Sequence, residues 1–164
     1  MDVVNTTDNS NDSEDRVATI ILSPDRSTFL IGHAPNRSFK KDNQWDIVGK
    51  GHIEYGDKPI ESAIRETLEE SNIDISGLPT TIIDTVKYKT GHMTIVAVVL
   101  PEMSVEIICK SVFDCFGKQL PEFSVFKWIT FAEAETHLYR GLYQTLTNAS
   151  IFEKIENQLK NGLL

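Results

Sequence analysis

Three closely spaced glutamates are the residues of this sequence best suited to chemistry. Glu66, Glu69 and Glu70 fall within five positions, and at 100° per residue on a helix their side chains share an arc of about 100°. Like charges at positions i and i+4 repel by about 0.2–0.5 kcal/mol, so Glu66 and Glu70 favour a bound cation. Arg65 is close in sequence but points off this arc. A hard divalent ion with oxygen ligands, Mg²⁺ or Mn²⁺, fits best, and a solvated acidic helix face is the alternative.

The segment around these glutamates has the signals of a loop that runs into a helix. The loop is Gly51–Asp57. We expect Asp57 to cap the free N–H groups at the helix start, and Pro59 lies in the first turn, where its missing donor costs little. Asn72 tolerates the left-handed conformation that ends many helices. The side of the helix away from the glutamates carries Ile60, Ala63, Ile64, Thr67 and Leu68.

The 23 positions from Gly51 to Ile73 resemble the Nudix box. That motif runs from a Gly through a Glu and an Arg-Glu pair to two adjacent Glu, a Gly and an aliphatic residue. The matching positions are Gly51, Arg65, Glu66, Glu69, Glu70 and Ile73. Three positions depart from it: Asp57 replaces Glu, Thr67 replaces an aliphatic residue and Asn72 replaces Gly.

The resemblance implies roles for the residues of the box. Glu66, Glu69 and Glu70 would bind the metal, and Arg65 would orient the helix by pairing with Asp57. The hydroxyl of Thr67 would be satisfied by the carbonyl four residues earlier.

The residues just before the box resemble one branch of the family. Lys50-Gly-His-Ile-Glu looks like the segment found in Nudix members that act on dinucleoside polyphosphates and related highly phosphorylated compounds. The resemblance implies that a backbone carbonyl near Lys50 is a metal ligand. The Lys50 side chain would meet phosphate or simply lie exposed. Tyr88 stands roughly where that branch has a base-stacking tyrosine, and an ordinary strand aromatic is the alternative.

A second segment resembles the family farther along the chain. Glu122 is followed six residues later by Trp128 in an expected strand, and Thr130 with Glu133 forms a capping box for a following helix. The resemblance makes Glu122 an extra metal ligand or the general base, whereas the alternative is a surface acid in a loop. Glu69 and Glu122 both remain candidates for the base.

The flanking pattern predicts a mixture of strands and helices. Strands are expected at residues 17–22, 29–33, 80–88, 93–100 and 105–109, with a four-residue loop at 89–92. The C-terminal segment has helical spacing with a break near 148–150, after which Ser150 would cap a final helix. These elements indicate an α/β or α+β domain, and the resemblance implies a Nudix-type α/β/α sandwich with a mixed β-sheet.

Composition limits the function classes. A chain of 164 residues with 40% hydrophobic content and a net charge of −8 is typical of one soluble domain at 16–164 that does not bind nucleic acid or anionic membranes in general. Residues 1–15 read as a flexible acidic tail, and 35–43 as a basic loop that is either solvated or faces the substrate. With two cysteines, no secretion signal and no membrane span, we expect a cytoplasmic protein.

The functional expectation follows from the box. We expect a Mg²⁺-dependent pyrophosphohydrolase, with Mn²⁺ as a substitute, that cleaves a nucleoside diphosphate linked to another group. Candidate substrates are dinucleoside polyphosphates, ADP-ribose or a nucleotide sugar, and the end of a capped RNA. The alternative is a Nudix-fold nucleotide-binding or sensor module of weak activity. We expect a monomer or homodimer that meets small-molecule nucleotides and no membrane.

Overall fold

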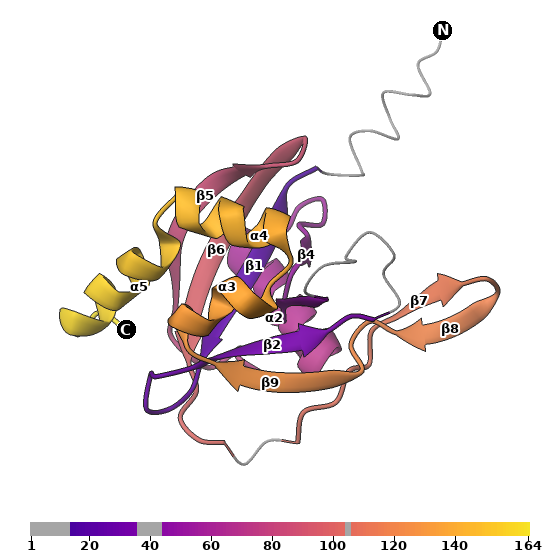
Figure 1. The fold of residues 1–164 in the computed structure, drawn as a ribbon, viewed down its shortest axis with the longest axis horizontal. Helices are drawn as coiled ribbons and strands as arrows, with labels where there is room; N and C mark the ends of the chain where they lie inside the picture. The colour runs from indigo at the N-terminus through magenta and orange to yellow at the C-terminus, as the bar shows by residue number, and fades with distance from the viewer. Residues whose placement is uncertain (1–13, 36–43, 104–105) are drawn as a thin grey trace, which may run out of the picture.

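A seven-stranded mixed sheet lies between helices, and a separate two-stranded hairpin projects from this body (Figure 1). The computed structural model describes residues 14–35, 44–103 and 106–164. The sheet has the order β3-β2-β1-β6-β5, with β4 also paired to β1 and β9 to β2. Its strands are β1 (Arg16–Leu22), β2 (Phe29–His33), β3 (Trp45–Ile47), β4 (Gly51–His52), β5 (Thr80–Tyr88), β6 (Gly91–Val99) and β9 (Val125–Ile129).

The sheet is mixed because its two central strands run in the same direction. β1 pairs with β6 in parallel over seven residue pairs, from Arg16↔Met93 to Leu22↔Val99. The other strand pairs of the sheet are antiparallel. Both central strands are apolar and buried along most of their length, as expected for strands covered on both faces.

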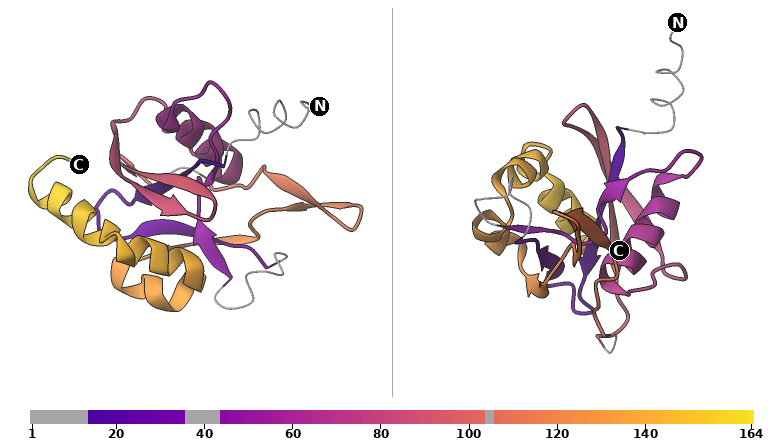
Figure 2. Two further views of the ribbon diagram at one scale, coloured as in Figure 1. Left: turned by 90° about the horizontal axis from the view of Figure 1, so that it is seen from above. Right: turned by 90° about the vertical axis from the view of Figure 1, so that its right-hand side faces the viewer.

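Helices cover both faces of the sheet, which the right-hand view of Figure 2 shows with α2 on one side and the C-terminal helices on the other. Successive side chains of a strand point to opposite faces. Ile20 accordingly joins a core with Leu142 and Ile155, whereas Val17 packs with Ala63 of α2. The expected α/β/α sandwich is confirmed.

Helix α2 (Pro59–Ser71) carries the three glutamates. Pro59 is its first residue and Asn72 ends it in the left-handed conformation (φ 67°), as predicted. The predicted N-cap is wrong: the cap is Lys58, whose N–H donates to Glu61 Oε1 at 2.7 Å. Asp57 is not available as a cap because it accepts hydrogen bonds from Arg65 and Ser62.

The C-terminal segment folds as a short 3-10 helix η1 (Phe131–Glu133) followed by α3 (Ala134–His137), α4 (Arg140–Asn148) and α5 (Ile151–Lys160). The predicted capping box is confirmed, since Glu133 N–H donates to Thr130 Oγ1 and Thr130 N–H to Glu133 Oε1. The break near residue 148 is also confirmed. Ser150 does not cap α5 through its side chain, because its backbone is left-handed (φ 55°).

Two further expectations need correction. Residues 106–109 form no strand, and the next strands are β7 (Val112–Cys115) and β8 (Lys118–Pro121), which make the projecting hairpin. The loop between β5 and β6 is shorter than expected, because β6 already begins at Gly91. Most of the basic loop at 35–43 and of the acidic tail lies outside the described residues. None of the helices in the described part of the chain is long and apolar enough to cross a membrane.

Candidate active site

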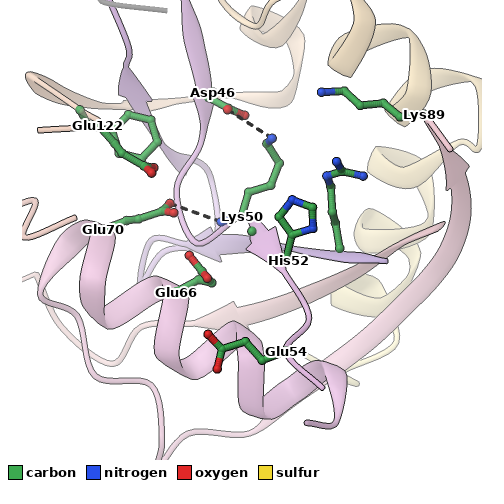
Figure 3. Close-up of a pocket in the computed structure, with 11 residues that line it drawn as sticks. Asp46, Lys50, His52, Glu54, Glu66, Glu70, Lys89 and Glu122 are labelled. Carbon is green, nitrogen blue, oxygen red and sulfur yellow. Dashed lines mark hydrogen bonds and ion pairs between the residues drawn. The ribbon is translucent and has the colours of Figure 1, made fainter. Parts of the chain in front are cut away.

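A polar cavity of about 340 Å³ opens beside α2, the loop that precedes it and the end of β8. Figure 3 shows Glu66, Glu70 and Glu122 on one side of this cavity and Lys89 on the other, with Asp46 paired to Lys50 between them. Its lining residues are Arg16, Asp46, Lys50, Gly51, His52, Glu54, Glu66, Glu70, Lys89, Glu122 and Phe123. Of the seven predicted site residues, Lys50, Glu66, Glu70 and Glu122 line the cavity, whereas Arg65, Glu69 and Tyr88 do not.

Glu70 is the most buried acid of the site, with 1% of its surface exposed. Its Oε1 accepts hydrogen bonds from the N–H groups of Gly49 at 2.8 Å and Lys50 at 3.3 Å. Burial raises the pKa of Glu70 well above its usual range, and the negative charges of Glu122 and Glu66 raise this pKa further. The loop therefore holds this carboxyl group at a fixed position facing other acids.

Glu66 lies one helical turn before Glu70 and lines the same side of the cavity. Burial and the nearby charge of Glu69 raise the pKa of Glu66, while Arg65 acts in the opposite direction. Gly51 gives the carboxylate its room, because a Cβ at this position would lie 2.4 Å from the Glu66 carboxyl carbon. The first glycine of the box is thus explained by the glutamate that packs against it.

Glu122 and Glu69, the two predicted candidates for the base, occupy different places. Glu122 follows β8 and its N–H donates to Ser111 O at 3.0 Å, and its side chain lines the cavity beside Glu70 (Figure 3). Glu69 has an exposed side chain outside the cavity lining. On a helix Glu69 is rotated by 60° from Glu66 and by 100° from Glu70, which moves it away when those two face the cavity.

Lys50 extends into the cavity and is ion-paired there. Its Nζ lies 3.4 Å from Asp46 Oδ2, and both side chains are largely buried. The same Nζ lies 5.8 Å from the ring centre of Tyr88 and 5.9 Å from that of Tyr139. Burial, the largest single effect, lowers the pKa of Lys50, but the interactions with Asp46, Tyr88 and Glu70 together outweigh it and the pKa is raised. The ammonium group therefore stays charged inside the cavity.

Arg65 holds the loop to the helix instead of facing the cavity. Its Nη1 donates to Asp57 Oδ2 at 2.6 Å, and its Nη2 donates to the His52 carbonyl at 3.3 Å and to Glu66 Oε2 at 3.3 Å. The expected pairing with Asp57 is confirmed, so the shorter aspartate still reaches the guanidinium group. This geometry is that of a residue that positions Glu66 and the loop.

Thr67 is fully buried behind this wall, and its expected hydrogen bond is absent. Among the described residues its Oγ1 has no hydrogen-bond partner, so the predicted bond to the carbonyl four residues earlier is wrong. Gly49 (φ 84°) passes so close that a Cβ there would lie 2.4 Å from this oxygen. The neighbouring Thr19 Oγ1 donates to Gly49 O at 2.9 Å.

Tyr88 belongs to the core rather than to the cavity surface. It is 5% exposed, and its hydroxyl lies 2.5 Å from the Tyr139 hydroxyl. Stacking on a nucleotide base, the predicted role, stays a prediction. Sequence reasoning missed Arg16, Asp46 and Lys89, which also line the cavity. Asp46 lies four residues before Lys50, and that spacing was the available signal.

A divalent cation fits this site by donor chemistry. Glu66, Glu70 and Glu122 offer carboxylate oxygens, the donors that Mg²⁺ prefers, and their mutual repulsion favours a cation. In the described residues, however, no three acidic, histidine or cysteine side chains already form a group that could hold a metal ion. The donor types therefore match the metal, although the described side chains do not already form a complete ligand set.

The family follows from a direct match. The model of the NUDIX domain matches residues 13–148. This chain belongs to the Nudix family. The match extends across the sheet, α2, the β7–β8 hairpin and α4, and it confirms the resemblance identified from residues 51–73. No curated protein matches the chain.

Solved structures with the same fold include several Nudix proteins. The chain shares 17% identity with the E. coli dihydroneopterin triphosphate pyrophosphohydrolase, at a TM-score of 0.62 over 84% of this chain and 95% of that one. It shares 18% identity with a C. elegans Ap4A hydrolase, at a TM-score of 0.57 over 90% of this chain and 98% of that one. The NUDIX domain of Shewanella oneidensis NrtR, in complex with ADP ribose, is 14% identical to this chain. Its TM-score is 0.58 over 97% of this chain and 99% of that one. At these identities the similarity establishes the fold.

Proposed function

We propose that this Nudix protein is a pyrophosphohydrolase that uses a divalent metal, Mg²⁺ or Mn²⁺, to cleave a nucleoside diphosphate linked to another group. Membership of the Nudix family and the Nudix hydrolases among the structural neighbours support the enzyme class. The single observation that carries the metal chemistry is the meeting of Glu66, Glu70 and Glu122 on one cavity.

The charge pattern of the cavity supports a phosphate substrate. A diphosphate is strongly anionic, and Lys50 supplies a buried positive charge within the same cavity as the carboxylates. When bound by Glu66, Glu70 and Glu122, a divalent cation supplies Lewis-acid stabilisation of phosphate charge and lowers the pKa of water. The lysine would then orient the phosphate chain, and the low dielectric of the buried site strengthens that interaction.

A carboxylate must accept the proton of the attacking water. Glu122 suits this role as the alternative to metal binding, because it faces the cavity from a different element than Glu66 and Glu70, which would then hold the metal. Glu69, the other predicted base and predicted metal ligand, would have to act from the exposed side of the helix. Arg65 would act by fixing the positions of Glu66 and the loop through its hydrogen bonds to both.

A second candidate function is a nucleotide-binding or sensor module with weak turnover. It is favoured by one observation, namely that the described acids do not already form a metal-binding group. The NUDIX domain of NrtR in complex with ADP ribose shows that the fold accepts such a ligand. Retention of the carboxylates Glu66 and Glu70 argues for turnover.

A release assay distinguishes the two functions. The protein is incubated with a dinucleoside tetraphosphate, ADP-ribose, a nucleotide sugar and a capped RNA fragment, with MgCl₂, with EDTA, and with EDTA followed by excess MgCl₂ or MnCl₂. We expect nucleotide release from at least one compound, its loss in EDTA and its recovery with metal. Full activity in EDTA would refute the metal chemistry, and binding without release in any metal would support the sensor module.

A further inference from the structure

The side of the cavity away from the carboxylates is basic, although the protein as a whole has a net charge of −8. Arg16, Lys50 and Lys89 line it together with the acids of α2. Figure 3 shows Lys89 across the cavity from Glu66 and Glu70. Arg16 begins β1, and Lys89 lies in the turn between β5 and β6. The fold thus brings cations from three separate segments to one wall.

The three cations are close to one another, because all of them surround the ring of Tyr88. Arg16 Cζ lies 5.7 Å from the centre of this ring, Lys50 Nζ 5.8 Å and Lys89 Nζ 5.3 Å. Like charges gathered around one ring repel one another in a partly buried site. An anion placed between them would relieve this repulsion.

The partners of these cations differ. Lys50 is neutralised by Asp46 at 3.4 Å. Arg16 Nη1 donates at 3.0 Å to the backbone carbonyl of Glu14, which carries no net charge. The Glu14 carboxylate itself accepts a hydrogen bond from Thr90 at 2.5 Å. Among the described residues, the guanidinium of Arg16 thus has a neutral carbonyl as its hydrogen-bond acceptor and forms no ion pair with a carboxylate.

We propose that Arg16 and Lys89 bind a phosphate beyond the diphosphate that lies against the acids, so that the substrate class is a nucleotide with three or more consecutive phosphates. This inference rests on the proposed function. Arginine presents a planar fork that matches phosphate oxygens, and lysine adds a point charge. A diphosphate joined to a sugar, such as ADP-ribose, has no phosphate to place at this wall, whereas a dinucleoside tetraphosphate has.

The first test compares kcat/KM for a dinucleoside tetraphosphate and for ADP-ribose. Variants Arg16→Gln and Lys89→Ala should each lower the value for the tetraphosphate by roughly tenfold, the effect of one charged hydrogen bond, and leave that for ADP-ribose within twofold. Lys87→Ala is the matched control, because Lys87 is an exposed lysine of β5, two residues before Lys89 and outside the cavity lining. Equal losses for both substrates, or no loss for either, would overturn the proposal.

A binding measurement separates this proposal from the proposed function. Inorganic tripolyphosphate and pyrophosphate are titrated into the wild-type protein and the same variants by calorimetry in the presence of MgCl₂. We expect tripolyphosphate to bind at least tenfold more tightly than pyrophosphate, and the variants to remove this difference. That result without hydrolysis of any compound would refute the proposed enzymatic function but support the proposed phosphate-binding site. Equal affinity of the two anions for the wild-type protein would refute the phosphate site, whatever the activity.

Discussion

Replacement of Thr67 by valine should stabilise the protein, although the residue lies in α2, the helix that lines the candidate active site. Thr67 is fully buried, and its hydroxyl has no hydrogen-bond partner in the part of the chain that the structure describes. An unsatisfied polar group of this kind costs about 1–3 kcal/mol, and valine has nearly the same shape without the oxygen. For a chain of this size 1 kcal/mol corresponds to about 2–4 °C in Tm, so we expect Tm to rise by at least about 2 °C.

Thr19→Val is the matched control, because Thr19 is equally buried and lies against the same glycine. Its hydroxyl donates to Gly49 O at 2.9 Å, so the control should lower stability by about 1 kcal/mol. Thermal and urea unfolding of both variants in EDTA measure the change in stability, which should be positive for Thr67→Val and negative for Thr19→Val. If Thr67→Val is destabilised as much as Thr19→Val, the hydroxyl has a partner and the reasoning is wrong.

Two further predictions concern other parts of the chain. Gly51→Ala should keep Tm within about 2 °C but lower kcat by roughly 10²-fold, because the new Cβ occupies the place of the flexible Glu66 carboxylate. Gly77→Ala is the control and should change neither Tm nor kcat, because Gly77 has open space around it. Unchanged kcat in Gly51→Ala would contradict the packing argument. Hydrogen bonds from nearby serines lower the pKa of Asp25 to about 2, so the stability it contributes is present above about pH 4 and is lost as pH falls toward 2. Asp25→Asn should therefore flatten that part of the curve of unfolding free energy against pH, and an unchanged slope would contradict the shift.

Local sequence was enough to predict the elements that carry strong signals. The apolar run of β1, the helix of the box and the capping box at Thr130 depend on neighbours within a few residues, and the structure has each of them. The N-cap was predicted wrongly because Asp57 is bound by Arg65, a residue eight positions later. The hairpin of β7 and β8 was hard to predict because its short strands have no apolar alternation.

The candidate site was predictable on α2 and less so across the cavity. The arc of glutamates identified Glu66 and Glu70, but a difference of 60° on the helix decides whether Glu69 faces the cavity or solvent. Arg16 and Lys89 escaped notice because they are far apart in sequence and meet only through the parallel pairing of β1 with β6. Tertiary pairing of this kind leaves no local pattern.

The turnover of Glu70→Gln in saturating MgCl₂ tests the central claim most directly. Glutamine keeps an oxygen for the N–H groups of Gly49 and Lys50, so the fold should survive while the charge is lost. We expect kcat on the best substrate of the panel to fall at least ~10²-fold, whereas Glu61→Gln, on the same helix but outside the cavity lining, should change it less than about twofold. Unchanged turnover in Glu70→Gln, with Tm preserved, would contradict the assignment of α2 as the catalytic metal site.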